Sequence, residues 1–342
     1  MPFLKKVIAV LVFTSLPSAA LALTCTSNVA TSGAWTSVGS WTTCGSTIPQ
    51  TTDTVVISAG DTIDMNTSPT VLGITINNTG VLSVDSNARV LTLTAAAGVP
   101  FTLTAGGTFT PGSSTVVVTG DAALTLTSGA ITFNNLTLSP TITAARTYAF
   151  GAGALTVDGD FLVNPNATSA RLLTLNMGAN ITVAGTTTIQ RRNLATAALN
   201  STGSNFDLTT AEMVIATGGT FAPSASTMTI TGTSGTLFTH NGTFTAATSN
   251  VLYTGDGSAT LTSTAAVTLN NLTLSPTITA ARTYTLGTGV VTVGGSLDVA
   301  PSAASGLNLL VNQGAAMTVT RNATFRRIAS ATSEWDSTGT NY

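Results

Sequence analysis

Two carboxylates stand two residues apart in the stretch Val157-Asp158-Gly159-Asp160. Paired carboxylates can ligate calcium, or they can act as the acid and base that cleave a glycosidic bond. The same stretch recurs later in the chain as Val293-Gly294-Gly295-Ser296, where both carboxylates are missing. We therefore interpret Asp158 and Asp160 as a polar turn, with a calcium-ligand pair and a catalytic pair as the alternatives.

Arginines are the second group that could do chemistry, because a guanidinium binds carboxylates and phosphates through two parallel hydrogen bonds. Adjacent residues of a strand face opposite sides, so at most one arginine of each adjacent pair can point inward. We interpret these arginines as members of solvated loops that end a coil, and the alternative is contact with an acidic glycan or a lipopolysaccharide phosphate. Six of them recur at matched positions: Arg146 with Arg282, Arg191 with Arg326, and Arg192 with Arg327.

His240 is the only histidine, and it lies in a stretch, Thr239-His240-Asn241-Gly242, whose composition is typical of a turn. No strained serine elbow accompanies it, so we interpret it as a solvated turn residue and not as part of a catalytic triad. Asp121 and Asp256 each follow a Thr-Gly step. An aspartate in such a turn commonly bonds its own backbone, and we expect that here.

The chain has two cysteines, Cys25 and Cys44. In an exported protein the default expectation is a disulfide between them, which would stabilise the folded state by about 3 kcal/mol. Two free thiols are the alternative. A metal site is disfavoured because no histidine lies near either cysteine.

The N-terminus has the features of a signal peptide over residues 1–22. Lys5 and Lys6 precede an apolar run, and Ala20-Leu21-Ala22 fits the small-residue rule for cleavage. The apolar run is too short to span a bilayer. A lipoprotein signal would need a small residue before Cys25, where Thr24 stands. We expect the mature chain to be secreted or held at a cell surface, in a bacterial setting, with no membrane-spanning segment.

Composition restricts the partners of the mature chain. Both lysines lie in the signal peptide, so nine arginines face 13 acidic residues and the formal charge is 9 − 13 = −4. Nucleic acid is therefore excluded as an expected partner, because neutralising phosphates needs clustered Lys and Arg. Hydrophobic residues make up 43% of the chain and charged residues only 7%, which indicates a folded core rather than disorder.

Repetition is the strongest signal in the sequence. Residues 134–148 recur without change at 270–284, an offset of 136, and Gly-Thr-Phe at 219–221 recurs 23 residues later at 242–244. A period in the low twenties suits one coil of a β-solenoid. Alternation such as Leu91-Thr92-Leu93-Thr94 indicates strands, and no helical stripe follows the signal peptide.

These patterns predict an all-β fold, an elongated right-handed parallel β-helix with an N-terminal cap; an up-and-down barrel is the alternative. We divide the chain into a signal peptide (1–22), a cap with the first coils (23–100), a first solenoid repeat (101–241) and an incomplete second repeat (242–342). Trp35, Trp41 and the two cysteines are expected to close the N-terminal end of the core.

The region from about residue 30 to 95 resembles the opening of G8-type domains, and the later coils are similar to repeats of bacterial adhesin-like exoproteins. The resemblance implies a right-handed parallel β-helix on or outside the cell surface, and it carries over no catalytic residue. It rests on these stretches: Gly33-Ala34-Trp35, Ser40-Trp41, Pro49, Asp53-Thr54-Val55-Val56-Ile57, Gly60-Asp61-Thr62-Ile63 and Leu72-Gly73-Ile74-Thr75-Ile76.

Export, repetition, low charge and the lack of a recognisable site together predict a structural or adhesive surface protein without catalytic activity or cofactor. The alternative is a β-helix that binds or cleaves glycans. Its partner would be a surface glycan or another surface protein.

The internal repeat also predicts that coils continue beyond Tyr342. The second copy matches the first through Ser337-Thr338-Gly339, which is still interior sequence, whereas terminal repeats are normally atypical and polar. Sequencing the DNA downstream of Tyr342 tests this. Further coils in frame are expected, and an in-frame stop codon with a soluble monomeric product would show that the prediction is wrong.

Overall fold

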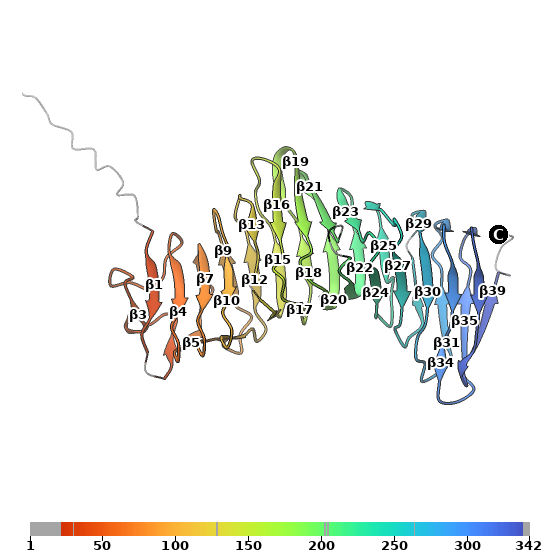
Figure 1. Ribbon diagram of the computed structural model, residues 1–342, viewed down its shortest axis with the longest axis horizontal. Helices are drawn as coiled ribbons and strands as arrows, with labels where there is room; N and C mark the ends of the chain where they lie inside the picture. The colour runs from red at the N-terminus through yellow and green to blue at the C-terminus, as the bar shows by residue number, and fades with distance from the viewer. Residues whose placement is uncertain are drawn as a thin grey trace, which may run out of the picture.

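A computed structural model describes residues 22–29, 31–127, 129–201, 203, 205–262 and 264–337 of the chain. These residues form an elongated stack of strands, with β1 (Thr24–Ser27) at one end of the rod and β39 (Thr332–Asp336) at the other (Figure 1). From residue 70 onward the stack is a parallel β-solenoid of about 11 turns. The predicted all-β solenoid is confirmed, while its right-handed sense stays a prediction. Most of the predicted signal peptide and the last five residues lie outside the described residues.

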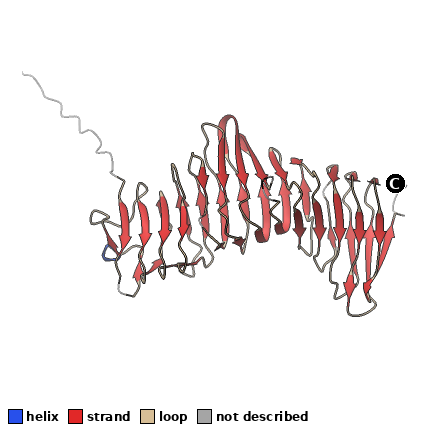
Figure 2. Cartoon of the chain, viewed as in Figure 1, coloured by secondary structure: helices blue, strands red, loops and turns tan. Residues whose placement is uncertain are grey.

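Strands account for nearly all regular structure in the described part of the chain (Figure 2), and a single 3₁₀ turn, η1 (Val38–Ser40), is the exception. No helix among the described residues is long and apolar enough to cross a membrane. The fold is therefore built from parallel strand pairing, with β1 and β3 as the one antiparallel pair that the structure describes.

Each N-terminal coil has three strands, and each strand belongs to a different sheet, so the rod begins with three faces. The first face holds β1 (Thr24–Ser27), β3 (Trp41–Thr42), β4 (Thr54–Ile57), β7 (Gly73–Ile76) and β10 (Phe101–Leu103). The second holds β2 (Gly33–Ala34), β5 (Thr62–Met65), β8 (Val81–Val84) and β11 (Thr108–Thr110).

The third face opens a 15-stranded sheet, which we call the long sheet. It contains β6 (Thr70–Val71), β9 (Val90–Leu93), β12 (Thr115–Val118), β14 (Ile131–Phe133), β15 (Asn135–Leu138), β17 (Leu155–Val157), β18 (Phe161–Val163), β20 (Ile181–Ile189), β22 (Leu208–Ile215), β24 (Thr227–Ile230), β25 (Phe238–His240), β27 (Asn250–Tyr253), β30 (Asn271–Leu274), β33 (Leu297–Val299) and β37 (Ala323–Phe325).

Four smaller sheets complete the rod. One contains β13 (Leu124–Thr125), β16 (Arg146–Ala149), β19 (Asn166–Asn176), β21 (Arg192–Asn200), β23 (Gly219–Ala222) and β26 (Thr243–Phe244). The others contain β28 (Ala259–Thr260), β31 (Arg282–Thr285), β35 (Asn308–Asn312) and β39 (Thr332–Asp336); β29 (Val267–Leu269), β32 (Val291–Val293) and β36 (Met317–Val319); and β34 (Ser302–Ala303) with β38 (Ile328–Ala329).

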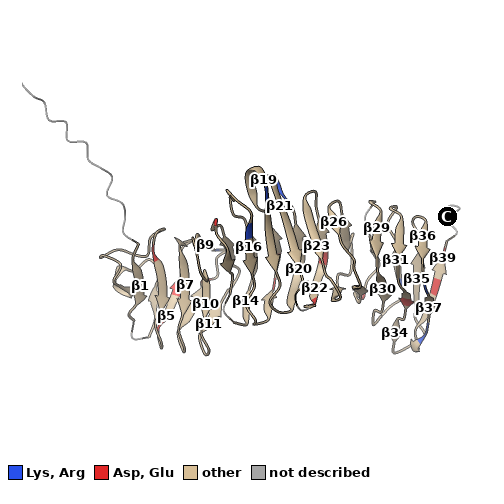
Figure 3. Cartoon of the chain, turned by 45° about the horizontal axis from the view of Figure 1, so that its top comes forward, with Lys and Arg blue, Asp and Glu red and all other residues tan. Residues whose placement is uncertain are grey.

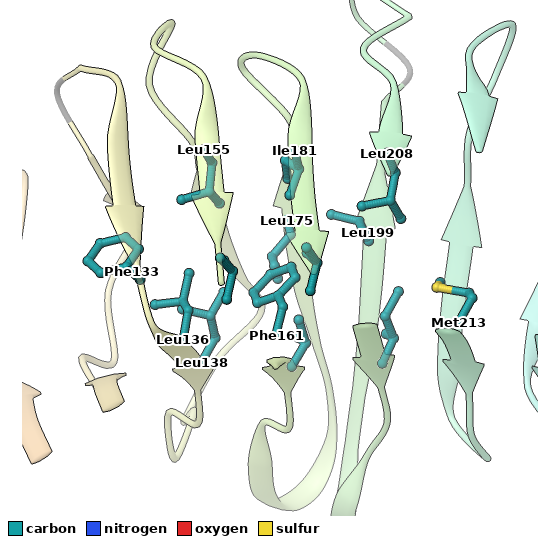
Figure 4. Close-up of a cluster of buried hydrophobic side chains, with 14 of the residues drawn as sticks. Phe133, Leu136, Leu138, Leu155, Phe161, Leu175, Ile181, Leu199, Leu208 and Met213 are labelled. Atoms are coloured by element: carbon teal, nitrogen blue, oxygen red, sulfur yellow. The ribbon is translucent and has the colours of Figure 1, made fainter. Parts of the chain in front are cut away.

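In-register pairing stacks hydrophobic side chains of one coil on hydrophobic side chains of the next inside the rod. Leu136 pairs with Phe161 on the next coil, and all the large side chains along this column are buried (Figure 4). The residue between two buried ones faces outward, so Thr132, Thr156 and Thr182 form an outer threonine column. Burying one Leu or Phe stabilises the fold by roughly 1.5–3 kcal/mol, and each added coil repeats that gain.

The long repeat does not contain a whole number of coils. Within the repeats, coil length varies from 20 residues between Thr115 and its partner Asn135 to 27 between Arg146 and its partner Leu173. β15 is aligned through β18 and β20 with the second half of β22. Its copy β30 is aligned through β27 and β24 with the first half of β22. The two copies therefore place the same residues on different columns of the long sheet.

The N-terminal end of the rod is closed by a small cap. β3 runs antiparallel to β1 and covers the edge that β1 would otherwise expose. Trp35 and Trp41 are buried with their ring centroids 5.0 Å apart, and Trp41 Nε1 donates to the Trp35 carbonyl at 2.9 Å. The predicted disulfide is present between Cys25 and Cys44, so β1 is tied to the segment that covers it.

Two buried aspartates hold the first coils in place. Asp61 Oδ2 accepts a hydrogen bond from Ser27 Oγ at 2.6 Å and one from the Val29 amide at 3.3 Å. Asp53 accepts from the Leu23 amide at 3.0 Å and from the Gln50 amide at 2.8 Å. Their charges are thus satisfied by neighbouring coils, as burial requires.

Removing the disulfide by Cys44→Ser should loosen the cap and leave the distal coils unchanged, because each coil contacts only its neighbours. The expected loss is about 3 kcal/mol of local stability. Hydrogen exchange by peptide checks this: β1, β3 and β4 should exchange faster, and β27 to β33 at the wild-type rate. Uniform acceleration along the whole rod would contradict the prediction.

Candidate functional site

An ion pair between adjacent coils occurs twice, once in each repeat. Arg146 Nε lies 2.6 Å from Asp121 Oδ1, and Asp121 Oδ2 accepts from the Thr143 amide at 3.1 Å and from its hydroxyl at 2.6 Å. In the second repeat Arg282 lies 2.7 Å from Asp256, which accepts from Thr279 in the same way. Each pair joins one turn of the rod to the next.

The expectation that Asp121 and Asp256 bond their own turns is wrong. Their carboxylates reach Thr143 and Thr279, 22 and 23 residues further along the chain. Because the coils stack in parallel, the Asp121 carboxylate lies beside Thr143 of the following coil, and the Asp256 carboxylate lies beside Thr279. The hydrogen bond from the arginine lowers the pKa of each aspartate to about 2, with the threonine bonds adding to the effect.

A buried tyrosine lies beneath each of these pairs. Tyr148 donates its hydroxyl to the Gly120 carbonyl, and Tyr284 donates to the Gly255 carbonyl at 2.5 Å. Burial raises the pKa of both phenols well above the ordinary value. The unit of aspartate, arginine, threonine and tyrosine is therefore a structural lock between coils.

The remaining candidate arginines differ between the two repeats. Arg326 Nη2 lies 2.5 Å from Asp298 Oδ2, and Arg327 Nε donates to the Ala329 carbonyl at 3.0 Å. Arg191 and Arg192 are exposed and form no ion pair within the described residues, and the strand register aligns them with Arg327 and Ile328 of the second repeat. The ion pair of Arg326 has no equivalent in the first repeat, because Gln190 and Leu162 stand where Arg326 and Asp298 stand in the second.

A third exposed arginine joins Arg191 and Arg192. Arg171 on β19 is aligned with Ala195 of β21, which follows Arg192 by three residues. Arg171 also lacks an ion pair among the described residues. These ends of β19 and β21 rise above the rest of the rod (Figure 1), and Figure 3 places basic residues there. We call Arg171, Arg191 and Arg192 the arginine corner.

Sequence reasoning missed Arg171 because its counterpart in the second repeat is Leu307, so the repeat did not single it out. Two leucines beside it are unusually exposed, Leu172 at 40% and Leu194 at 53%. This surface of the first repeat thus has both cationic and apolar side chains.

The carboxylates predicted to form a polar turn lie beside a shallow groove. The groove has a volume of about 350 Å³ on the outer face of β15, β18 and β20, where Asp160 and Leu162 line it. Asp160 Oδ1 accepts from the Thr186 amide at 2.9 Å, and its own amide donates to Asn135 Oδ1 at 2.9 Å. Asp160 therefore fastens consecutive coils as well as facing the groove.

The next carboxylate along this column is Glu212. Asp160 is aligned with Thr186, which is aligned with Glu212, and the Thr186 hydroxyl donates to Glu212 Oε2 at 3.4 Å. No cluster of three or more His, Cys, Asp or Glu among the described residues could hold a metal ion. We call Asp160 and Glu212 the acidic edge of the long sheet.

His240 does not lie in a turn. It ends strand β25, half-buried, with its ring 6.0 Å from that of Phe238. Burial lowers its pKa, with a backbone hydrogen bond to Ala266 acting in the opposite direction. The composition of the stretch was misleading because Asn241 and Gly242 form the turn and His240 precedes it.

Comparison with protein families shows that residues 40–172 match the G8 domain. The match reaches from the cap through the first part of β19, further along the chain than the resemblance seen in the sequence. No curated protein matches the chain, and no solved structure does.

The ion pair of the second repeat should make stability depend on acid pH. The pKa of Asp256 is lowered to about 2, so its contribution is fully present above about pH 4 and is lost as the pH falls through 2. The melting temperature of Asp256→Asn should lie below that of the wild type at pH 6, and the gap should narrow through pH 2 and close near pH 1. Asp158→Asn is the control and should match the wild type throughout; a gap of unchanged size near pH 1 would contradict the assignment.

Proposed function

We propose that the mature chain is an exported rod that serves as a structural or adhesive element of a cell surface and has no catalytic activity. The G8 domain and the β-solenoid fit a surface or extracellular β-helix protein. A disulfide and the lack of a membrane-spanning helix in the described part of the chain are consistent with that location.

The observation that carries the proposal is how the charged side chains are used. Three ion pairs join consecutive coils: Asp121 with Arg146, Asp256 with Arg282, and Asp298 with Arg326. Buried carboxylates in the cap likewise bond neighbouring coils. In a chain with only 7% charged residues, this use of charge supports a rod whose chemistry is devoted to holding its shape.

The shape itself suits a surface role. Parallel strands lie about 4.8 Å apart, so about 11 turns give a rod of roughly 50 Å. Such a rod presents a long, threonine-rich face at a fixed distance from its attachment, and its stability is a sum of local contacts rather than of one compact core.

Glycan binding or cleavage is the second candidate, and the acidic edge favours it. Asp160 lines the groove, and Glu212 lies two coils from Asp160, which corresponds to about 9.6 Å between their backbones. Inverting glycosidases separate their two carboxyl groups by about 6.5–9.5 Å. Under this alternative the two carboxylates would bind or activate groups of a sugar chain lying across the sheet.

Protease shaving of intact cells tests the surface role. Peptides from residues 23–337 should be released while a periplasmic marker stays inside, and recovery of the chain only from the cytoplasm would contradict export.

Catalysis is tested on the purified mature chain with a panel of polysaccharides. We expect no release of reducing ends above background. Release that is abolished in Asp160→Asn and in Glu212→Gln, but not in the control Asp207→Asn, would establish the second candidate and overturn the first.

A further inference from the structure

The first repeat carries unpaired charges of both signs on the same few coils. The acidic edge, Asp160 and Glu212, has no ion pair among the described residues, and neither has the arginine corner. In the second repeat Asp160 is replaced by Ser296, and Arg326 is neutralised by Asp298. The first repeat thus carries unpaired charges of both signs, whereas the second keeps the exposed Arg327 but has Ser296 in place of the carboxylate of Asp160.

These opposite charges cannot meet within one chain. Asp160 is aligned with Thr186 of β20, and Arg191 follows Thr186 by five residues. Five residues of extended strand span about 16 Å, several times the length of an ion pair. The acidic edge therefore lies near the middle of β20 and β22, and Arg191 lies beyond the end of β20, where the chain turns toward β21 and the neighbouring sheet.

The surface between them is suited to contact with another surface. Leu162, Thr188 and Val214 form an in-register column that faces outward and is only partly buried. The column has apolar and threonine side chains and no charge, and the shallow groove beside it is lined by Phe161 and Leu162. Faces of this kind pack against a second sheet at about 10 Å.

We propose that a second copy of this chain packs against this face. A two-fold axis parallel to the rod turns the sheet over and reverses the direction of its strands. The acidic edge of each copy then lies opposite the arginine corner of the other, and the two uncharged columns meet between them. This is a closed, self-complementary contact of the kind that most homodimers use.

Charge complementarity selects the second copy as occupant. The mature chain has a net charge of −4, so the arginine corner is attracted to any anionic surface, but only another copy also supplies a cationic edge for Asp160 and Glu212. Ions screen exposed pairs over about 10 Å at 0.1 M salt, so the dimer should weaken as salt rises. The rods lie side by side and parallel, which allows both to project from one surface.

Sedimentation of the mature chain with charge-swapped variants tests the dimer. The wild type should have twice the monomer mass at low salt. Arg191→Glu with Arg192→Glu, and separately Glu212→Arg with Asp160→Arg, should each weaken self-association at least about tenfold. Mixing the two variants should restore a dimer, because each now complements the other.

The control changes charge equally in the second repeat, with Arg321→Glu and Arg327→Glu, and should dimerise like the wild type. Circular dichroism checks that each variant folds. If Asp160→Arg unfolds the protein, Glu212→Arg alone replaces the double variant of the acidic edge. A monomeric wild type, unchanged association in the swapped variants, or no recovery on mixing would each overturn the proposal. So would arginine variants that lose binding to another anionic partner while still dimerising.

Discussion

In-register parallel pairing between one coil and the next is the constraint on which the whole molecule depends. It places Leu136 over Phe161 in the core and Thr156 over Thr182 on the surface, so a single rule builds both. It also brings residues 19 to 30 positions apart within reach of each other. The bonds that hold the rod, from Asp121 to Arg146 and from Asn135 to Asp160, all use this distance.

The same constraint explains several small residues of the repeat. A side chain at Gly159 or Gly185 would collide with Asn135 or Asp160 of the preceding coil, because those amide and carboxylate oxygens reach across to the next backbone. The Gly-Asp and Gly-Thr steps are thus needed for coil-to-coil bonding and are not merely flexible. Function then depends on which outward side chains are left over once the coils are fastened, and in the first repeat those are the acidic edge and the arginine corner.

Much of this architecture could be predicted from sequence, because alternation and repetition are local patterns. Leu91-Thr92-Leu93-Thr94 indicated a strand, and Cys25 with Cys44 indicated a disulfide; both are confirmed. The partners of Asp121 and Asp256 could not be predicted, since a carboxylate that bonds the next coil reads like any turn aspartate. The grouping of Arg171 with Arg192 could not be predicted either. The repeat offset of 136 residues is not a whole number of coils, so it does not show which residues of neighbouring coils lie side by side.

Cysteine pairs on neighbouring coils test the register most directly. Thr182 is aligned with Thr209, and Thr188 with Val214, so the cysteine pairs 182 with 209 and 188 with 214 should each form a bridge under mild oxidation. The crossed pair, Thr182→Cys with Val214→Cys, is displaced by several residues along the strand and should remain reduced. Bridging of the crossed pair, or none in the aligned pairs, would contradict the in-register solenoid on which the rest of the account depends.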